Sequence, residues 1–205
     1  MIKHRIGKLR DQFIKYNIDG YVVPKNDEFF SEYSNKDRLK IISNFTGSAG
    51  YAVILKKKSF LFVDGRYSIQ AKIESGKDFK ILKYEKIINT NIFKNLNLGI
   101  DPTLFTSNQI KRFFLKNNKV TFINENLIDK IYKFRSKKKV PFYALNKETT
   151  GENHPQKISK VCSYLKKNKS DYLFITAPEN IAWLLNIRGY DNPTSPVPNC
   201  YLVIS

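Results

Sequence analysis

Cysteine and histidine are almost absent from this chain, and their scarcity excludes several chemistries. The 205 residues contain two cysteines, Cys162 and Cys200, and two histidines, His4 and His154. The cysteines show no pairing pattern, so we expect no disulfide framework and a reducing, cytoplasmic compartment. Neither histidine has cysteines, acids or a second histidine at metal-ligand spacing. The sequence therefore predicts no metal site within these residues.

Long apolar runs are also lacking. No stretch of about 18 apolar residues is present, so no membrane span is expected. The first residues lack the apolar core and cleavage site of a signal peptide. Disorder is disfavoured as well, because 41% of the residues are hydrophobic and 14% are aromatic. The length is sufficient for one large domain or two small ones.

Acidic residues are few, and 36 lysines and arginines against 18 aspartates and glutamates give a net charge of +18. Such a surface can bind phosphate groups, so a nucleic-acid binder is one hypothesis. However, the basic residues are 29 lysines and only 7 arginines, scattered along the chain. Specific base recognition favours arginine. We therefore interpret the charge as surface composition and expect no nucleic-acid or membrane partner.

Apolar periodicity predicts helices alternating with short strands over the first 135 residues. Helices are predicted at 3–16, 67–74, 87–95, 107–115 and 127–134, with helical turns within 28–43. Strands are predicted at 21–23, 51–55, 59–63, 79–84, 98–100 and 120–123. The short turn at 56–58 joins two strands into an antiparallel hairpin. The predicted fold class is α/β, with a mixed sheet flanked by helices.

A basic segment at 135–141, which ends in Val140-Pro141, is predicted to be a linker between domains. The pattern then restarts, with a helix at 156–166 and strands at 172–175 and 200–205. The phrase Asn44-Phe45-Thr46-Gly47 is echoed by Asn186-Ile187-Arg188-Gly189. We interpret this as an internal duplication, with a first domain at 1–136 and an incomplete second copy at 137–205. The chain is therefore expected to be part of a longer protein.

Two motifs of small residues flank the predicted hairpin. Residues 44–50 precede its first strand, and residues 64–67 end its second strand and open a helix. The glycines supply positive φ or close backbone approach, and Asp64 is predicted to cap the helix. Arg66 then remains available for another domain or a substrate carboxylate. Ser48 does not fit a nucleophile elbow, because it precedes a strand rather than a helix.

A second candidate region is the amphipathic helix predicted from Glu179, after Pro178, to a glycine cap at Gly189. Trp183, the single tryptophan, is interpreted as core or interdomain packing. Arg188 is a candidate for contact with a substrate or another domain.

Four segments, taken in order, resemble the long, three-domain branch of the aminopeptidase P family, which is related to creatinase and prolidase. They are Asp19–Pro24, Asn44–Gly50, Phe62–Tyr67 and Ile181–Gly189. The resemblance covers essentially the whole chain. It implies the creatinase/prolidase N-terminal, RNase H-like fold, present once in full and again in part.

The resemblance also implies a function for the parent protein. Members of this family remove the N-terminal residue from peptides with proline second, using two divalent metals, manganese or zinc, in a C-terminal domain. None of their five metal ligands matches a residue here. The resemblance thus implies a non-catalytic portion that supports homodimerisation and access of proline-containing peptides to the active site, with Arg66, Trp183 and Arg188 as candidate contacts. A non-enzymatic peptide- or protein-binding module of the same fold is the alternative.

Overall fold

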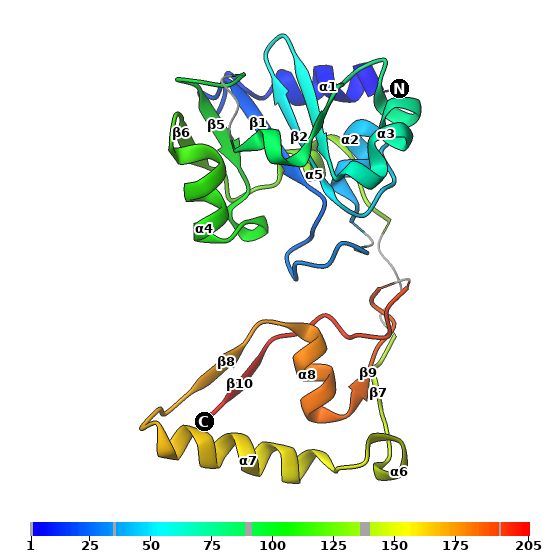
Figure 1. Ribbon diagram of the computed structural model, residues 1–205, viewed down its shortest axis with the longest axis vertical. Coiled ribbons are helices and arrows are strands. Elements are labelled where there is room, and N and C mark those ends of the chain that lie inside the picture. Colours follow the sequence, from blue (N-terminus) through cyan, green and yellow to red (C-terminus); the bar gives the residue numbers. More distant parts are fainter. Residues whose placement is uncertain (1, 35, 89–91, 136–139, 193) are drawn as a thin grey trace. The chain divides into compact units, whose positions relative to one another are not determined.

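In a computed structural model of the chain, the segments with alternating apolar residues form a six-stranded sheet (Figure 1). Its order is β4-β3-β2-β1-β5-β6. The pairs β1–β2 and β2–β3 are antiparallel, and the other three are parallel, so only β2 runs against the rest. The predicted mixed sheet is confirmed. The strands are β1 (Gly20–Pro24), β2 (Gly50–Leu55), β3 (Ser59–Val63), β4 (Lys80–Lys83), β5 (Asn97–Ile100) and β6 (Lys119–Phe122).

The structure describes residues 2–34, 36–88, 92–135, 140–192 and 194–205. The chain divides into two units. One comprises Met1–Glu28 with Lys36–Arg135, and the other comprises Phe29–Asn35 with Ser136–Ser205. Most of residues 135–141, the predicted linker, lie outside the described residues. No helix among the described residues is long and apolar enough to cross a bilayer.

The central strands β1, β2 and β3 of the first unit are buried on both faces because they are almost wholly apolar, whereas the edge strands β4 and β6 carry lysines and are partly exposed. Alternate residues supply two separate cores, as the strand period of two requires. In β3, for example, Leu61 and Val63 join one core, and Phe60 and Phe62 join the other.

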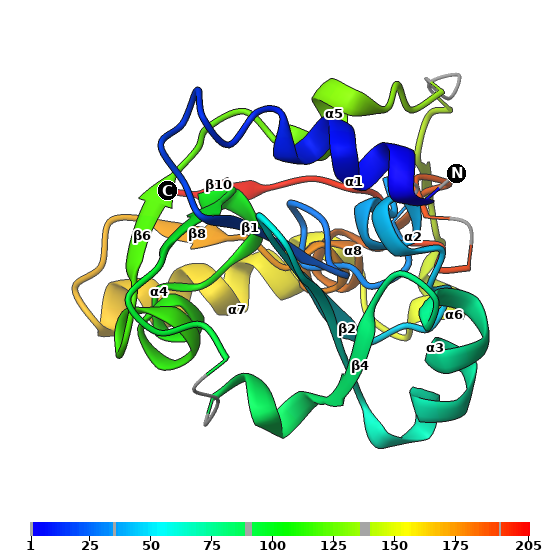
Figure 2. The ribbon, with the colours of Figure 1, turned by 90° about the horizontal axis from the view of Figure 1, so that it is seen from above.

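Helices cover both faces of this sheet. The helices α1 (Ile2–Arg10), α2 (Arg38–Ser43), α3 (Ser68–Ser75) and α5 (Leu127–Ile131) contribute to the first core. The helix α4 (Ser107–Ile110), its π-helical continuation Lys111–Leu115 and the 3₁₀ turns Tyr84–Ile87 and Pro102–Leu104 contribute to the second. Figure 2 shows α1, α2 and α5 on one side of β1 and β2, with α4 on the other. Thr106 forms a capping box with Gln109 at the start of α4.

Three predicted helices differ from the structure. The helix predicted at 3–16 ends at Arg10, because the next turns use shorter i→i+3 bonds and Asn17 has a positive φ of 49°. The helix predicted at 87–95 is replaced in its described part by turns, since this asparagine-rich segment has low helix propensity; residues 89–91 lie outside the description. The last, predicted at 127–134, ends at Ile131.

The second unit is built on a smaller core. It contains β7 (Tyr143–Ala144), α6 (Lys147–Thr150), α7 (His154–Lys167), β8 (Leu173–Ile175), α8 (Pro178–Leu185), β9 (Ile187–Arg188) and β10 (Leu202–Ile204). Two strand pairs form, β8 with β10 and β7 with β9. Among the described residues, the buried members of its apolar cluster are Leu165, Leu184 and Ile204. Phe174 and Val203, directly opposite each other, are both 59% exposed.

The order and pairing of elements repeat between the units. The first unit begins α1-β1-α2-β2 with β1 and β2 antiparallel, and the second contains α7-β8-α8-β10 with β8 and β10 antiparallel. The helix between the strands ends each time in an asparagine with left-handed backbone, Asn44 (φ 65°) and Asn186 (φ 55°). Asn186, not the predicted Gly189, therefore caps α8, because an asparagine tolerates this conformation better than most residues.

A cation from the preceding helix holds each of these asparagines. The fourth residue of α1, Arg5, donates from Nη2 to Oδ1 of Asn44 at 2.6 Å. The fourth residue of α7, Lys157, donates from Nζ to Oδ1 of Asn186 at 2.7 Å. We call this arrangement the cation–asparagine latch. It fixes α1 to the end of α2, and α7 to the end of α8.

The left-handed cap makes a prediction for Asn44. Replacement by alanine places a Cβ in the left-handed region and removes the acceptor of Arg5, so Asn44→Ala lowers the free energy of unfolding by about 1–2 kcal/mol. Asn44→Gly keeps the backbone conformation and lowers it by less than about 1 kcal/mol. Urea unfolding measures both. The control is Asn117→Ala, at an exposed asparagine, with a change within about 0.5 kcal/mol. Equal losses for Asn44→Ala and Asn117→Ala would contradict the latch.

Candidate functional site

The first candidate motif folds as a tight loop between α2 and β2. After the cap at Asn44, Phe45 is fully buried. A Cβ at Gly47 would lie 2.3 Å from the ring of Phe45, and a Cβ at Gly50 would lie 2.9 Å from the carbonyl oxygen of Phe62. Only glycine fits these two positions, because the loop folds back over its own aromatic anchor.

The second motif forms the 3₁₀ turn Gly65–Tyr67 that leads into α3. Oδ1 of Asp64 accepts hydrogen bonds from the backbone N–H of Arg66 at 3.0 Å and from its Nε at 2.9 Å. The predicted cap at Asp64 is thus confirmed. The hydrogen bonds from Arg66 lower the pKa of the Asp64 carboxyl. The guanidinium lies over the ring of Tyr67, and the Arg66 side chain stays 74% exposed.

Direct contacts join the two motifs. The ring of Tyr67 meets Phe45 edge-on at 5.8 Å, and its hydroxyl lies 2.9 Å from Oγ of Ser48. The carboxylate of Glu74 on α3 accepts from the backbone N–H and the hydroxyl of Thr46 at 2.8 and 2.7 Å. The loop at 44–50 and the start of α3 therefore form one unit. The hydroxyl of Ser48 contacts a tyrosine and, among the described residues, no histidine, so it lacks the general base of a nucleophile.

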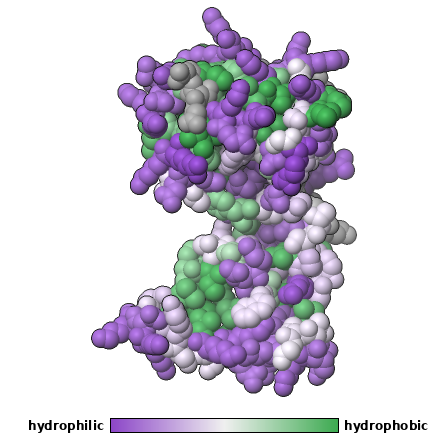
Figure 3. Space-filling view, in the orientation of Figure 1, coloured by the Kyte–Doolittle hydropathy of each residue, from purple (hydrophilic) through white to green (hydrophobic). Residues whose placement is uncertain are grey.

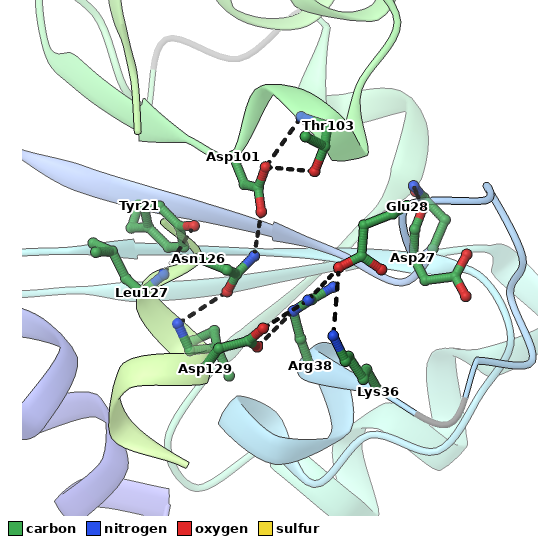
Figure 4. A network of polar contacts seen from close by, with 12 residues as sticks. Tyr21, Asp27, Glu28, Lys36, Arg38, Asp101, Thr103, Asn126, Leu127 and Asp129 are labelled. Atoms are coloured by element: carbon green, nitrogen blue, oxygen red, sulfur yellow. Dashed lines mark hydrogen bonds and ion pairs between the residues drawn. The ribbon is translucent and has the colours of Figure 1, made fainter. Parts of the chain in front are cut away.

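A second polar cluster lies beyond the carboxyl ends of β1 and β5 (Figure 4). Its centre is Arg38, whose side chain is 2% exposed. The guanidinium grips Asp129 with both Nε and Nη2, at 2.7 and 2.8 Å, and Nη2 also donates to Glu28 at 2.6 Å. This bidentate geometry is the strong form of an arginine–carboxylate pair. It connects α2, α5 and the end of the segment that follows β1.

The charges of this cluster stabilise one another. Burial alone would lower the pKa of Arg38, but the hydrogen bonds that it donates to Asp129 and Glu28 outweigh burial and raise that pKa. For Glu28 the directions are reversed. Burial by itself would raise the pKa of its carboxyl group, but the hydrogen bond donated by Arg38 outweighs burial and lowers that pKa. Glu28 is thus an ionised acceptor rather than a proton carrier. The cluster is a clamp between elements, with no free base of the kind that acid–base catalysis needs.

Next to this clamp, the side chains of Asp101, Thr103 and Asn126 complete the polar edge of the sheet. Asn126 donates to Asp101 at 2.9 Å, and Asp101 also accepts from the backbone and the hydroxyl of Thr103. The backbone N–H of Leu127 donates to the hydroxyl of Tyr21. Ligands of open α/β sheets commonly bind outside the carboxyl ends of the strands. Here that edge is occupied by the protein's own hydrogen bonds.

In the second unit, Trp183 and Arg188 lie at the end of α8. Trp183 does not belong to the core of its unit, because it is 60% exposed. Nζ of Lys157 lies 4.2 Å from the centre of its ring and donates to its carbonyl oxygen at 2.9 Å. Arg188 donates from Nη1 to the carbonyl oxygens of Ala182 and Ile187, at 3.2 and 2.8 Å, and so caps the helix end.

Sequence reasoning missed the buried cations Arg38 and Lys157. Lys157 precedes Val161 and Leu165 by four and eight positions, on the apolar face of α7. A lysine on the apolar face of a predicted helix indicates a buried ammonium group with hydrogen-bond partners, because lysine is almost never buried without partners. Arg38 gives no comparable signal, since its partner Asp129 is 91 residues away.

No metal centre is formed by the described part of the chain, in which no three histidine, cysteine, aspartate or glutamate side chains gather in a position to hold an ion. His4 and His154 are both exposed. Arg66, in the first unit, and Trp183 and Arg188, in the second, remain predicted contacts rather than members of a catalytic group.

Comparison with known proteins gives a consistent result. Residues 5–131 and residues 133–205 each match a family described as Creatinase/Prolidase N-terminal domain. The chain is 32% identical to a probable Xaa-Pro aminopeptidase P of Laccaria bicolor, over 98% of this chain and 34% of the relative. It is 33% identical to Xaa-Pro aminopeptidase 1 of Dictyostelium discoideum, over 99% of this chain and 36% of the relative.

A solved structure shows the same likeness. The X-prolyl aminopeptidase of Caenorhabditis elegans, described as a cytosolic enzyme with a di-nuclear active site, superposes with a TM-score of 0.88. Its sequence is 27% identical, and the match covers 100% of this chain and 37% of the nematode protein. The chain thus spans about a third of the length of the curated relatives it matches.

The carboxylate clamp predicts a large effect for Arg38. Arg38→Met leaves Asp129 without its cation and removes the nearer of the two cations beside Glu28, and we expect the free energy of unfolding to fall by about 2–4 kcal/mol. The double variant Arg38→Met/Asp129→Leu should recover part of this loss, because one unpaired carboxylate is then gone. Arg112→Met, at an exposed arginine, is the control. A double variant no more stable than Arg38→Met would show that charge pairing is not the cause.

The contact between the motifs predicts a pH dependence. Burial raises the pKa of Glu74, but hydrogen bonds from Thr46 and Gln70 outweigh it and lower the pKa. The stabilisation is therefore present above the unfolded-state pKa of about 4.3 and is lost as the pH falls through the folded-state value. Glu74→Gln should thus lower stability at pH 7 by up to about 1 kcal/mol and have a smaller effect near pH 3.

Urea unfolding across this pH range measures the effect of Glu74→Gln. Glu85→Gln, at an exposed glutamate, is the control and should show no such pH dependence. A loss at Glu74→Gln that is the same at both pH values would contradict the ionised contact.

Proposed function

This chain belongs to the creatinase/prolidase N-terminal domain family, and on that premise we propose that it is the non-catalytic N-terminal portion of an Xaa-Pro aminopeptidase. The parent enzyme releases the N-terminal residue from peptides that carry proline second. One observation carries the proposal. The similarity extends over 98% of this chain but only 34% of a relative named as such an enzyme. The remaining two thirds of the parent would then hold the reactive centre.

The cofactor proposal follows from the same observation. The nematode relative is described as having a di-nuclear active site, and the described residues of this chain bring together no set of metal ligands. We therefore assign two divalent ions, manganese or zinc, to the part of the parent outside these residues. Metal-bound water is the nucleophile that such a pair supplies when bound. The cytosolic description of the nematode enzyme supports a cytoplasmic location.

For the chain itself we propose a supporting role in homodimerisation and in access of peptides to the active site. Residues 1–136 form one creatinase N-terminal-like domain in this proposal, and residues 137–205 form part of a second. The exposed guanidinium of Arg66 and the exposed ring of Trp183 support it, since arginine and tryptophan are favoured at contact sites. Arg188 supports the same role indirectly, because its hydrogen bond to the carbonyl oxygen of Ala182 stabilises the end of α8 next to Trp183.

An alternative is a peptide- or protein-binding module with no enzyme attached. The apolar outer face of the β8–β10 ribbon favours it, because Phe174 and Val203 are both 59% exposed. In addition, the outer edges of a two-stranded ribbon can accept a further strand from a bound peptide. The two hypotheses differ in what the rest of the parent does.

Peptidase assays test the proposal. The purified 205-residue chain and the full-length parent are each incubated with a tripeptide whose second residue is proline, with manganese or zinc added. We expect release of the first residue by the full-length protein alone. Proline-specific release by the 205-residue chain would overturn the non-catalytic assignment. An inactive, well-folded full-length protein would favour the binding module.

Arg66 gives a prediction within the full-length protein. Because its side chain is 74% exposed, Arg66→Ala should change the unfolding free energy by no more than about 0.5 kcal/mol. If it contacts substrate or another domain, the variant should lower kcat/KM at least fivefold or weaken the dimer. Kinetics and sedimentation measure these effects, with Arg112→Ala as the control. Unchanged activity and assembly would remove Arg66 from the site.

A further inference from the structure

The outward face of α3 and its flanks presents only cations, isoleucines and glycines. Its exposed residues recur every three or four positions, so they line one side of the helix. They are Gly65, Arg66, Ile69, Lys72, Ile73, Gly76 and Lys77. Ile69 is 74% exposed and Ile73 is 80% exposed. We call this set the α3 ridge, and Figure 3 shows apolar side chains at the corresponding rim of the first unit.

Asp64 pairs with Arg66 and so neutralises one of the three cations of the ridge. Glu74, in contrast, is turned aside to Thr46 and Gln70. Lys72 and Lys77 are therefore the cations that the ridge presents to a partner. Beyond the helix, a hollow of about 450 Å³ is lined by Lys57, Lys58 and Lys80 with a single acid, Asp78. The positive surface thus continues from α3 to the turn of the β2–β3 hairpin.

The ridge is held outward by the inner face of the same helix. Ala71 is fully buried against the sheet, and the hydroxyl of Ser75 donates to the carbonyl oxygen of Ser43 at 2.8 Å. Ile69 and Ile73 cannot rotate into the core while these contacts persist. Burying an isoleucine side chain is favourable, so two of them side by side form a surface that favours an apolar cover.

We propose that the α3 ridge binds an acidic amphipathic helical segment of a protein partner. Ile69 and Ile73 lie one turn apart, which matches a facing helix with apolar side chains at i and i+4. Carboxylates beside that apolar pair would meet Lys72 and Lys77. A second α3 ridge is a poor occupant, because two like cationic surfaces facing each other repel. Nucleic acid offers phosphates but makes little use of the isoleucines.

The test uses fluorescence anisotropy with two labelled peptides at 150 mM salt, about the physiological value. One is a helical 14-mer of glutamates with leucines at i and i+4 positions, and the other has the same charge with serines in place of the leucines. We expect the 205-residue chain to bind the leucine peptide at least tenfold more tightly. Ile69→Ser/Ile73→Ser should remove this preference, and Lys72→Glu/Lys77→Glu should weaken binding of both peptides.

Ile14→Ser is the matched control, because Ile14 is 89% exposed and lies after α1, outside the ridge. It should bind both peptides like the parent chain. Circular dichroism checks that every variant keeps its fold, which the exposure of the changed side chains favours. Equal affinity for the two peptides would overturn the proposal, as would equal losses for Ile14→Ser and Ile69→Ser/Ile73→Ser.

A membrane is the other surface that a cationic, apolar ridge can meet. Vesicles of phosphatidylcholine with about 30% phosphatidylserine therefore form a second arm. Ile69-dependent binding to these vesicles, without a preference for the leucine peptide, would overturn the proposal and assign the ridge to lipid. Preference for the peptide with weak, isoleucine-independent vesicle binding supports it.

Discussion

The latch between a helix cation and a left-handed asparagine is the constraint on which both units depend. In each, the helix between two antiparallel strands must stop and reverse within a few residues. Asn44 and Asn186 make that reversal with positive φ, and Arg5 and Lys157 hold it from the preceding helix. Because each latch uses one cation and one amide oxygen, it fixes the angle between two helices without a large core. This matters most in the second unit, where the apolar cluster has three buried members among the described residues.

The candidate site of the first unit is a consequence of that reversal. Once Asn44 has turned the chain, Phe45 is buried and Gly47 passes directly over its ring. The loop can then meet α3, where Glu74 takes both polar groups of Thr46 and Tyr67 lies against Phe45. With its inner face engaged in these contacts, the opposite face of α3 is exposed. The same contacts that stabilise the loop therefore present Ile69 and Ile73 to a partner.

Much of the first unit is predictable from sequence because its signals are local. The hairpin of β2 and β3, the cap at Asp64 and the capping box at Thr106 each depend on residues within a few positions. The Arg38 clamp could not be predicted, since it joins residues 91 positions apart that have no common local pattern. The prediction that Gly189 caps α8 was wrong for a related reason. It is small because it lies against Pro198, where a Cβ would be 2.8 Å from the proline, and not because it ends α8.

The net charge of the chain can be interpreted only after the contacts of the individual cations are known. Arg38 and Lys157, both nearly fully buried, are structural, and each has oxygen acceptors supplied by this chain. The lysines of the α3 ridge are exposed, and they flank isoleucines that have no place in a phosphate-binding surface. A net charge of +18 by itself favours polyanions. Its arrangement here favours a partner that offers carboxylates and apolar side chains together, which is a property of proteins rather than of nucleic acids.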